Sequence, residues 1–309
     1  MIAKSTMIAA SVFALSHVAH AGPDNVAPPI VGGITTSDFA AVGAMMACEG
    51  ATCDMYCSAT LIHNEWIVTA AHCINILEDS IGDNVDHYFT IGDDIHSVTA
   101  YDQIVDWAVH PEYVNDDELN NDIAVARLSQ GIDNITPIAL NDEILGQELV
   151  GTELTFVGYG VANDNHSGGG FKRTADMSVD DLDQDYIYAE DDIQSLCDGD
   201  SGGAALEISQ GETLLVAVNA FIYGVNASAD TCDAEGAGAT RIDTHLDFIT
   251  THVDLNVTVP LTDANDWNAL ADTADGEANP ALGCSSAPTA PTLGMVALAL
   301  GLIGFRRRD

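Results

Sequence analysis

The chain has 309 residues, of which 48 are Asp or Glu and only 8 are Lys or Arg, so its formal net charge at pH 7 is −40. A surface this acidic repels nucleic acids and anionic lipid headgroups, which excludes both as partners. The length allows one or two domains, and the charge favours a saline setting in which counterions screen self-repulsion.

The first 21 residues have the pattern of a secretory signal peptide. Lys4 precedes an apolar run from Met7 to Leu15, and the sequence AHA then supplies a cleavage site. We therefore expect an exported protein in which disulfides can form. Residues 22–29, GPDNVAPP, form a short lead that ends before IVGG at 30–33.

The stretch from about residue 40 to residue 253 has the pattern of an all-β domain. Short apolar runs alternate with turn residues, as in a sandwich or barrel. Strands are predicted within the segments 57–69, 122–128, 153–160 and 213–224. AAHC at 70–73 predicts a tight helical turn. One helix is predicted at the end of the domain, because apolar residues recur there at helical spacing: Ile242, Leu246, Ile249 and Val253.

The sequence CDGDSGG at 197–203 presents Ser201 as a candidate nucleophile. A serine hydroxyl becomes nucleophilic when a base takes its proton and a third group orients that base. Among ten histidines, His72 is the candidate base, because small and apolar neighbours in TAAHC fix its backbone. A histidine satisfied within the core is the alternative interpretation. Asp122 is the candidate orienting acid, since it opens the apolar strand IAVARL.

The glycines around Ser201 predict an oxyanion site. A tight turn lets the backbone N–H groups of Gly199 and Ser201 point at one spot, where they can stabilise a tetrahedral intermediate. Asp200 lies between them, and a buried carboxylate there needs a cationic partner.

Five motifs in order, IVGG, TAAHC, NNDIAVARL, GYG and CDGDSGG, resemble the trypsin/chymotrypsin family of serine endopeptidases over residues 30 to about 255. The resemblance implies two six-stranded antiparallel β-barrels with a C-terminal helix. It makes His72, Asp122 and Ser201 the catalytic triad, and Gly199 and Ser201 the oxyanion hole.

The same resemblance implies an activation pair. Proteolysis before Ile30 would free an α-amino group that pairs with Asp200 and orders the oxyanion loop. Pro29 stands where relatives usually carry a basic residue, so we expect an activating protease other than trypsin.

The resemblance implies two disulfides, Cys57–Cys73 and Cys197–Cys232. A third disulfide, between Cys48 and Cys53, is expected to join the two strands of a hairpin. Six cysteines permit other pairings. Cys284 is left over.

The specificity pocket departs from that of trypsin. Ser195 stands at its predicted base, where trypsin-like members carry Asp, so a preference for basic P1 residues, on the acyl side of the cleaved bond, is not expected. Phe221 and Ile222 are predicted in the pocket wall, where Ile222 would favour small or medium apolar P1 side chains. Asp198 at the lip remains able to attract a cation.

No cofactor and no metal are expected. The acidic stretches 78–86 and 180–185 lack the spacing of an EF-hand, so solvated charge is favoured over calcium.

Beyond the domain, residues 256–283 are predicted to be an acidic linker and 284–309 a C-terminal tail with an apolar run and three arginines. The tail, with Cys284, is similar to the sorting tails of secreted myxobacterial proteins. It predicts processing by sorting machinery and retention at the cell surface; a free thiol is the alternative.

The sequence thus predicts a secreted serine endopeptidase acting on polypeptides. The alternatives are a catalytically silent binding module on the same scaffold and a hydrolase of esters.

Overall fold

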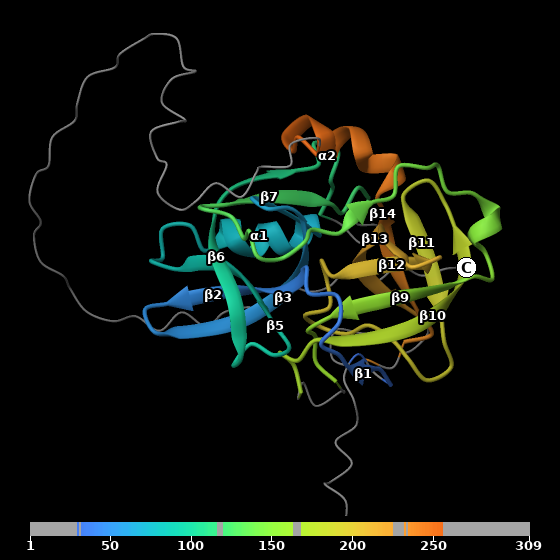
Figure 1. Cartoon of the computed structure of the whole chain (residues 1–309), viewed down its shortest axis with the longest axis horizontal. Coiled ribbons are helices and arrows are strands. Elements are labelled where there is room, and N and C mark those ends of the chain that lie inside the picture. The colour runs from blue at the N-terminus through green and yellow to red at the C-terminus, as the bar shows by residue number, and fades with distance from the viewer. Residues whose placement is uncertain are drawn as a thin grey trace, which may run out of the picture.

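The structure is a computed structural model of the whole chain, in which residues 30, 32–115, 120–162, 168–224, 232 and 234–255 are described (Figure 1). The predicted signal peptide, lead segment, linker and tail, together with Cys284, lie outside these residues. No helix in the described ranges is long and apolar enough to cross a membrane.

The first half of the domain is a closed antiparallel barrel of six strands in the order β2-β3-β4-β7-β6-β5. The strands are β2 (Val42–Glu49), β3 (Thr52–His63), β4 (Trp66–Thr69), β5 (Asp86–Gly92), β6 (Val98–Val109) and β7 (Ala124–Leu128). The long β2 and β3 form a hairpin that Cys48 and Cys53 join at its end.

The second half is a second six-stranded ring in the order β9-β10-β11-β14-β13-β12, closed by pairing of β12 with β9. The strands are β9 (Glu153–Gly158), β10 (Arg173–Leu182), β11 (Tyr186–Glu190), β12 (Ala204–Ser209), β13 (Glu212–Tyr223) and β14 (Gly236–Arg241). Two short strands join this sheet, since β1 (Ile34–Thr35) pairs with β10 and β8 (Ala139–Leu140) pairs with β13. The predicted pair of antiparallel barrels is confirmed.

Burial follows the pleat where a strand has one face in the core. In β10, Met177 and Val179 are buried while Asp176, Ser178 and Asp180 are exposed. β13 is different, because it is buried on both faces from Leu215 to Tyr223. Near its end, Ile222 belongs to the core of the second barrel while its neighbours Phe221 and Tyr223 belong to a separate cluster of mostly aromatic side chains, so both faces are covered.

The helices differ in length from the prediction. The predicted turn at AAHC extends into α1 (Ala71–Asp79), because Ile74 and Leu77 continue its buried face. The predicted C-terminal helix is present but shorter. It consists of the 3-10 turn η2 (Asp243–His245) and α2 (Leu246–His252), while another 3-10 turn, η1 (Gln147–Leu149), precedes β9. In Figure 1, α1 lies among the strands of the first barrel and α2 lies at the top of the molecule beside β7.

Candidate active site

His72 and Asp122 meet because two paired strands of the first barrel end side by side. Thr69 at the end of β4 pairs with Ala124 at the start of β7. His72 follows β4 in the first turn of α1, and Asp122 immediately precedes β7. Nδ1 of His72 lies 2.7 Å from Oδ2 of Asp122, and the backbone N–H of His72 donates to Oδ1 at 2.9 Å. Both carboxylate oxygens of this fully buried aspartate therefore hold the histidine.

Two opposed effects set the pKa of His72. Burial is the largest single effect and lowers the pKa, but the charge of Asp122 and its hydrogen bond raise it. Together the contributions of Asp122 prevail, so the pKa lies above 6.5. Because Nδ1 is engaged by Asp122, Nε2 is the ring nitrogen available to a nucleophile.

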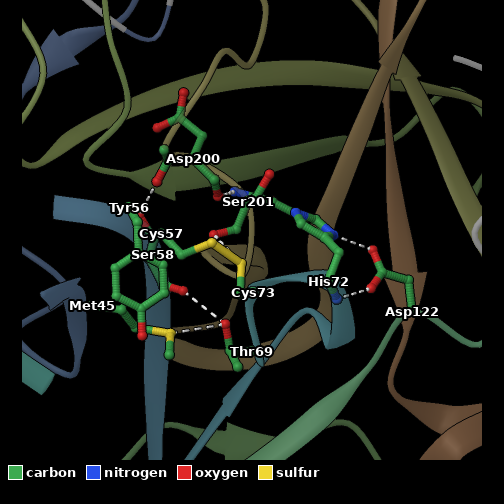
Figure 2. The surroundings of a disulfide bond; sticks show 12 residues. Met45, Tyr56, Cys57, Ser58, Thr69, His72, Cys73, Asp122, Asp200 and Ser201 are labelled. Carbon is green, nitrogen blue, oxygen red and sulfur yellow. Dashed lines mark hydrogen bonds and ion pairs between the residues drawn. A yellow bond between two sulfur atoms is a disulfide. The ribbon is translucent and has the colours of Figure 1, made fainter. Parts of the chain in front are cut away.

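Ser201 lies on the other side of the His72 ring from Asp122 (Figure 2). Its segment is fixed to the first barrel by the backbone N–H of Ser58, which donates to the Ser201 carbonyl at 2.8 Å. The sulfur of Cys73 lies 3.7 Å from that carbonyl oxygen. The three residues predicted as a triad are thus brought together from three separate parts of the chain.

The turn before Ser201 has the backbone that the glycines predict. Gly199 has a φ of 91°, and its carbonyl accepts a hydrogen bond from the Ser58 hydroxyl at 2.7 Å. With that carbonyl turned toward Ser58, the N–H groups of Gly199 and Ser201 have no acceptor among the described residues. Two neighbouring free donors are what an oxyanion site requires.

Asp200 lies fully buried beneath this turn. Its Oδ1 accepts from the Gly160 N–H at 2.8 Å and its Oδ2 from the Cys197 N–H at 3.0 Å. The glycines of the GYG motif are required for this packing, because a Cβ on Gly158 would lie 2.2 Å from Oδ1 and one on Gly160 would lie 2.5 Å from Cγ.

The pKa of Asp200 is raised to about 7. Burial is the main cause, and the charge of Asp198 adds to it. The two backbone N–H groups and the charge of Arg173 act in the opposite direction without prevailing. A carboxylate in this state favours the approach of a further cation.

Arg173 is a nearby cation that the sequence did not reveal. It pairs with Gly158 across β9 and β10, so its side chain leaves the sheet on the face where Gly158 meets Asp200. It is 4% exposed, and its Nε has no hydrogen-bond partner among the described residues. Its position depends on strand register, which no motif in the sequence specified.

Ile30, the other predicted member of the activation pair, is fully buried. It belongs to the same apolar cluster of the second barrel as Leu196 and Ile222. Its φ is 38°, a value that a β-branched residue rarely adopts.

A pocket adjoins Ser201, lined by the segments 196–198 and 219–222. It brings together three of the four predicted specificity residues, Asp198, Phe221 and Ile222. Ser195 is buried just before the first segment, donates to the carbonyl of Leu196 and is not among the lining residues. The ring of Phe221 packs edge-on to Tyr186, with ring centres 5.0 Å apart.

The three expected disulfides are present, joining Cys48 to Cys53, Cys57 to Cys73 and Cys197 to Cys232. The second fastens the start of α1, and with it His72, to β3 (Figure 2). The third fastens residue 197 of the pocket lining to the chain before β14.

Residues 30–249 match the sequence family described as Trypsin. The chain is 33% identical over 216 residues to brachyurin of Leptuca pugilator, covering 64% of this chain and 88% of the relative. It is 27% identical over 212 residues to a venom serine protease of Polistes dominula, covering 63% of this chain and 75% of the relative. It is also 32% identical over 187 residues to vitamin K-dependent protein C of Rattus norvegicus, covering 52% of this chain but 39% of that protein.

Proposed function

The chain belongs to the trypsin family of serine proteases, and from this membership we propose that it is a secreted endopeptidase that cleaves polypeptides through Ser201, His72 and Asp122. The observation that carries the proposal is the position of the His72 ring between Ser201 and the buried carboxylate of Asp122 (Figure 2). Nδ1 of His72 lies 2.7 Å from Oδ2 of Asp122.

In the proposed reaction, Nε2 of His72 takes the proton of the Ser201 hydroxyl as its oxygen attacks the peptide carbonyl. The N–H groups of Gly199 and Ser201 stabilise the negative charge on the carbonyl oxygen. His72 then gives the proton to the departing amine, and the acyl group remains on Ser201 as an ester. Water, deprotonated by His72, attacks this ester and releases the carboxylic acid with Ser201 restored. The mechanism uses no cofactor.

We further propose that cleavage before Ile30 matures the enzyme. The φ of 38° at Ile30 is one that a β-branched residue rarely adopts, and cleavage before Ile30 removes the constraint on this dihedral angle. The freed α-amino group is a cation that can pair with the carboxylate of Asp200. Burial of this carboxylate raises its pKa more than its two hydrogen bonds and the charge of Arg173 lower it. Pro29 before this bond argues for an activating protease that does not require a basic residue.

Export, retention of the protein at the cell surface through a tail processed by sorting machinery, and the absence of a preference for basic P1 residues are parts of the same proposal. Export is supported by the signal-like segment 1–21 and retention by the apolar run 293–305. The P1 preference is supported by the pocket lining, whose one charged residue, Asp198, is half-exposed.

The test combines N-terminal sequencing of the secreted protein with a fluorophosphonate probe, which labels an activated serine. We expect an N-terminus at Ile30 and labelling that Ser201→Ala abolishes. Ser178→Ala, an exposed serine of β10, is the matched control and should keep full labelling. If protein that begins at Ile30 is not labelled, the endopeptidase proposal fails and a silent binding module is favoured.

A further inference from the structure

Asn121 directly precedes Asp122, and its backbone has a φ of 55°, in the left-handed region. Asparagine adopts this region more readily than most residues with a side chain. The Asn121 carbonyl accepts from the Ile123 N–H at 2.7 Å, so the chain turns tightly around Asp122. The direction from which the Asp122 carboxylate approaches His72 therefore depends on the backbone of Asn121.

The side chain of Asn121 is held from two sides. Nδ2 donates to the Glu112 carbonyl at 3.2 Å, and Oδ1 lies 3.2 Å from Nε2 of His245. Because a carbonyl can only accept, the bond to Glu112 orients the amide with Oδ1 toward His245. Oδ1 also only accepts, so its bond to His245 uses a hydrogen on Nε2. The turn before Asp122 is thus attached to η2, which lies 124 residues further along the chain at His245.

His245 is 3% exposed, and its second ring nitrogen is engaged as well. Nδ1 lies 2.8 Å from the Arg241 carbonyl oxygen and 3.0 Å from Oγ1 of Thr244. The neutral ring carries one hydrogen and can donate to Arg241 or to Asn121, but not to both. The Thr244 hydroxyl can donate to Nδ1, which allows the neutral ring to place its hydrogen on Nε2 and keep the bond to Asn121.

The surroundings of His245 keep the ring neutral at the pH of catalysis. Burial is the largest effect and lowers the pKa of His245, and the charge of Arg241 acts in the same direction. Three groups raise this pKa without prevailing, namely the Arg241 carbonyl and the carboxylates of Asp185 and Asp243.

His110 packs edge-on against His245, with ring centres 5.2 Å apart. Burial and the charge of His245 lower the pKa of His110, against the charges of Glu112 and Asp185. Both rings are therefore mostly neutral at the pH at which His72, whose pKa is raised, loses its proton.

This inference rests on the proposed function. We propose that His245 is a positioning residue for the reaction, which holds the Asn121 side chain and thereby fixes the turn that presents Asp122 to His72. A residue with only a structural role would change the stability of the protein, whereas a positioning residue also changes how strongly Asp122 acts on His72. His245 is not among the residues that line the pocket beside Ser201, so its effect is expected on kcat rather than on KM.

The first test compares His245→Gln with His245→Asn in protein that begins at Ile30. The amide of glutamine extends one bond further than that of asparagine. In His245→Gln it reaches the place of Nε2 and can bond to Asn121, whereas in His245→Asn it reaches only the place of Nδ1. The two variants therefore separate the bond to Asn121 from the bond to the Arg241 carbonyl.

We expect His245→Asn to lower kcat per labelled Ser201 at least about tenfold with KM unchanged, because a misplacement of about 1 Å can cost on the order of 100-fold in rate. The acid limb of kcat/KM against pH should move to lower pH, since Asp122 then raises the pKa of His72 less. His245→Gln should keep the wild-type kcat and acid limb. His252→Asn, at an exposed histidine of α2, is the matched control and should keep both as well.

The second test removes the other partner of the same bond. Asn121→Gly keeps the left-handed backbone accessible but deletes the amide. We expect the fall in kcat and the shift of the acid limb seen in His245→Asn. The combined variant should be no worse than either single variant, because both changes remove one interaction.

Several results would overturn the inference while leaving the endopeptidase intact. One is a His245→Asn enzyme with wild-type kcat and acid limb, whatever its stability. Others are a fall in kcat that His245→Gln shares, and effects that add in the combined variant. If His245→Asn does not fold, Asn121→Gly decides alone, and a wild-type kcat and acid limb in that variant reject the inference. A wild type that is not labelled, by contrast, indicates failure of the proposed function itself.

Discussion

Asp122 holds His72 with both carboxylate oxygens, and this arrangement sets the acid limit of activity. His72 must be neutral to accept the serine proton, so activity falls as the pH drops through its raised pKa. In Asp122→Asn, burial would act on His72 without an opposing charge and lower its pKa. We expect kcat to fall on the order of 10⁴-fold and the acid limb of kcat/KM against pH to move to lower pH.

The measurement is a pH profile of both enzymes with one peptide substrate. Asp247→Asn removes an exposed acid of α2 and should leave the profile unchanged. An acid limb at the same pH in Asp122→Asn would show that Asp122 does not govern His72.

Asp200 makes the stability of the uncleaved chain depend on pH. Its pKa in the fold is about 7 against 3.8 for the free side chain, so the folded state retains a proton that the unfolded state has lost between these values. The resulting stabilisation is complete below about pH 4 and is lost as the pH rises through about 7. Relative to Asp200→Asn, the uncleaved wild type should lose on the order of 4 kcal/mol over this range.

Urea unfolding of both proteins from pH 4 to pH 8 measures this difference. In protein that begins at Ile30, the α-amino group should lower the pKa of Asp200 and reduce the loss. If the difference in unfolding free energy between the uncleaved wild type and Asp200→Asn stays constant with pH, the pKa of Asp200 is not raised in the fold.

At residue level, the motifs TAAHC, NNDIAVARL and CDGDSGG singled out His72, Asp122 and Ser201, and the fold brings these three residues together. Arg173 was not predicted to lie near Asp200. Its place there follows from its pairing with Gly158 across β9 and β10, and this register is not local in sequence.

Between the elements, Tyr159 is a direct link from one barrel to the other. It follows β9 of the second barrel, and its hydroxyl donates to the carbonyls of Val42 and Gly92 in the first. Its burial raises the pKa of the phenol, which keeps the hydroxyl protonated. Tyr159→Phe leaves both carbonyls without this donor and should cost about 1–3 kcal/mol of unfolding free energy.

Urea denaturation should show a lower midpoint with an unchanged slope, since the buried area is the same. Tyr101→Phe, at an exposed position of β6, is the control and should leave the midpoint within error. Equal midpoints for both variants would mean that the Tyr159 hydroxyl contributes nothing.

At the level of elements, alternation and turn residues predicted strands and the all-β class, but helix limits were less accurate. α1 extends past its predicted turn because Ile74 and Leu77 find a core to cover. The final helix is shorter than its apolar spacing suggested, because Ile242 and Val253 are buried on either side of the helical turns rather than within α2.

Across the whole molecule, few cations remain at the surface to balance the acids. Of the four Lys and Arg residues in the described ranges, Lys172, Arg173 and Arg241 are buried. The fourth, Arg127, has a side chain that is 39% exposed and lies 3.8 Å from Asp106. The net charge of −40 is therefore expressed largely as repulsion at the surface.

Salt should accordingly stabilise the protein. Raising NaCl from 0.1 M to 1 M shortens the screening length from about 10 Å to about 3 Å. We expect Tm to rise by about 5 °C, which corresponds to relief of roughly 2 kcal/mol of repulsion for a domain of this size. Sucrose at matched osmolality is the control, and an equal rise in sucrose would exclude screening as the cause.

Closure of both barrels has a consequence in concentrated salt. When charges are screened, acidic proteins lose the repulsion that keeps neighbouring copies apart, and exposed sheet edges then become sites of aggregation. Here every strand of each six-membered ring is paired on both sides, from β5 with β2 to β12 with β9. The rings therefore offer no free backbone edge to a second molecule, and among the described strands the free edges are those of β1 and β8, which have two residues each. We expect this topology to limit aggregation at high ionic strength, where charge no longer does so.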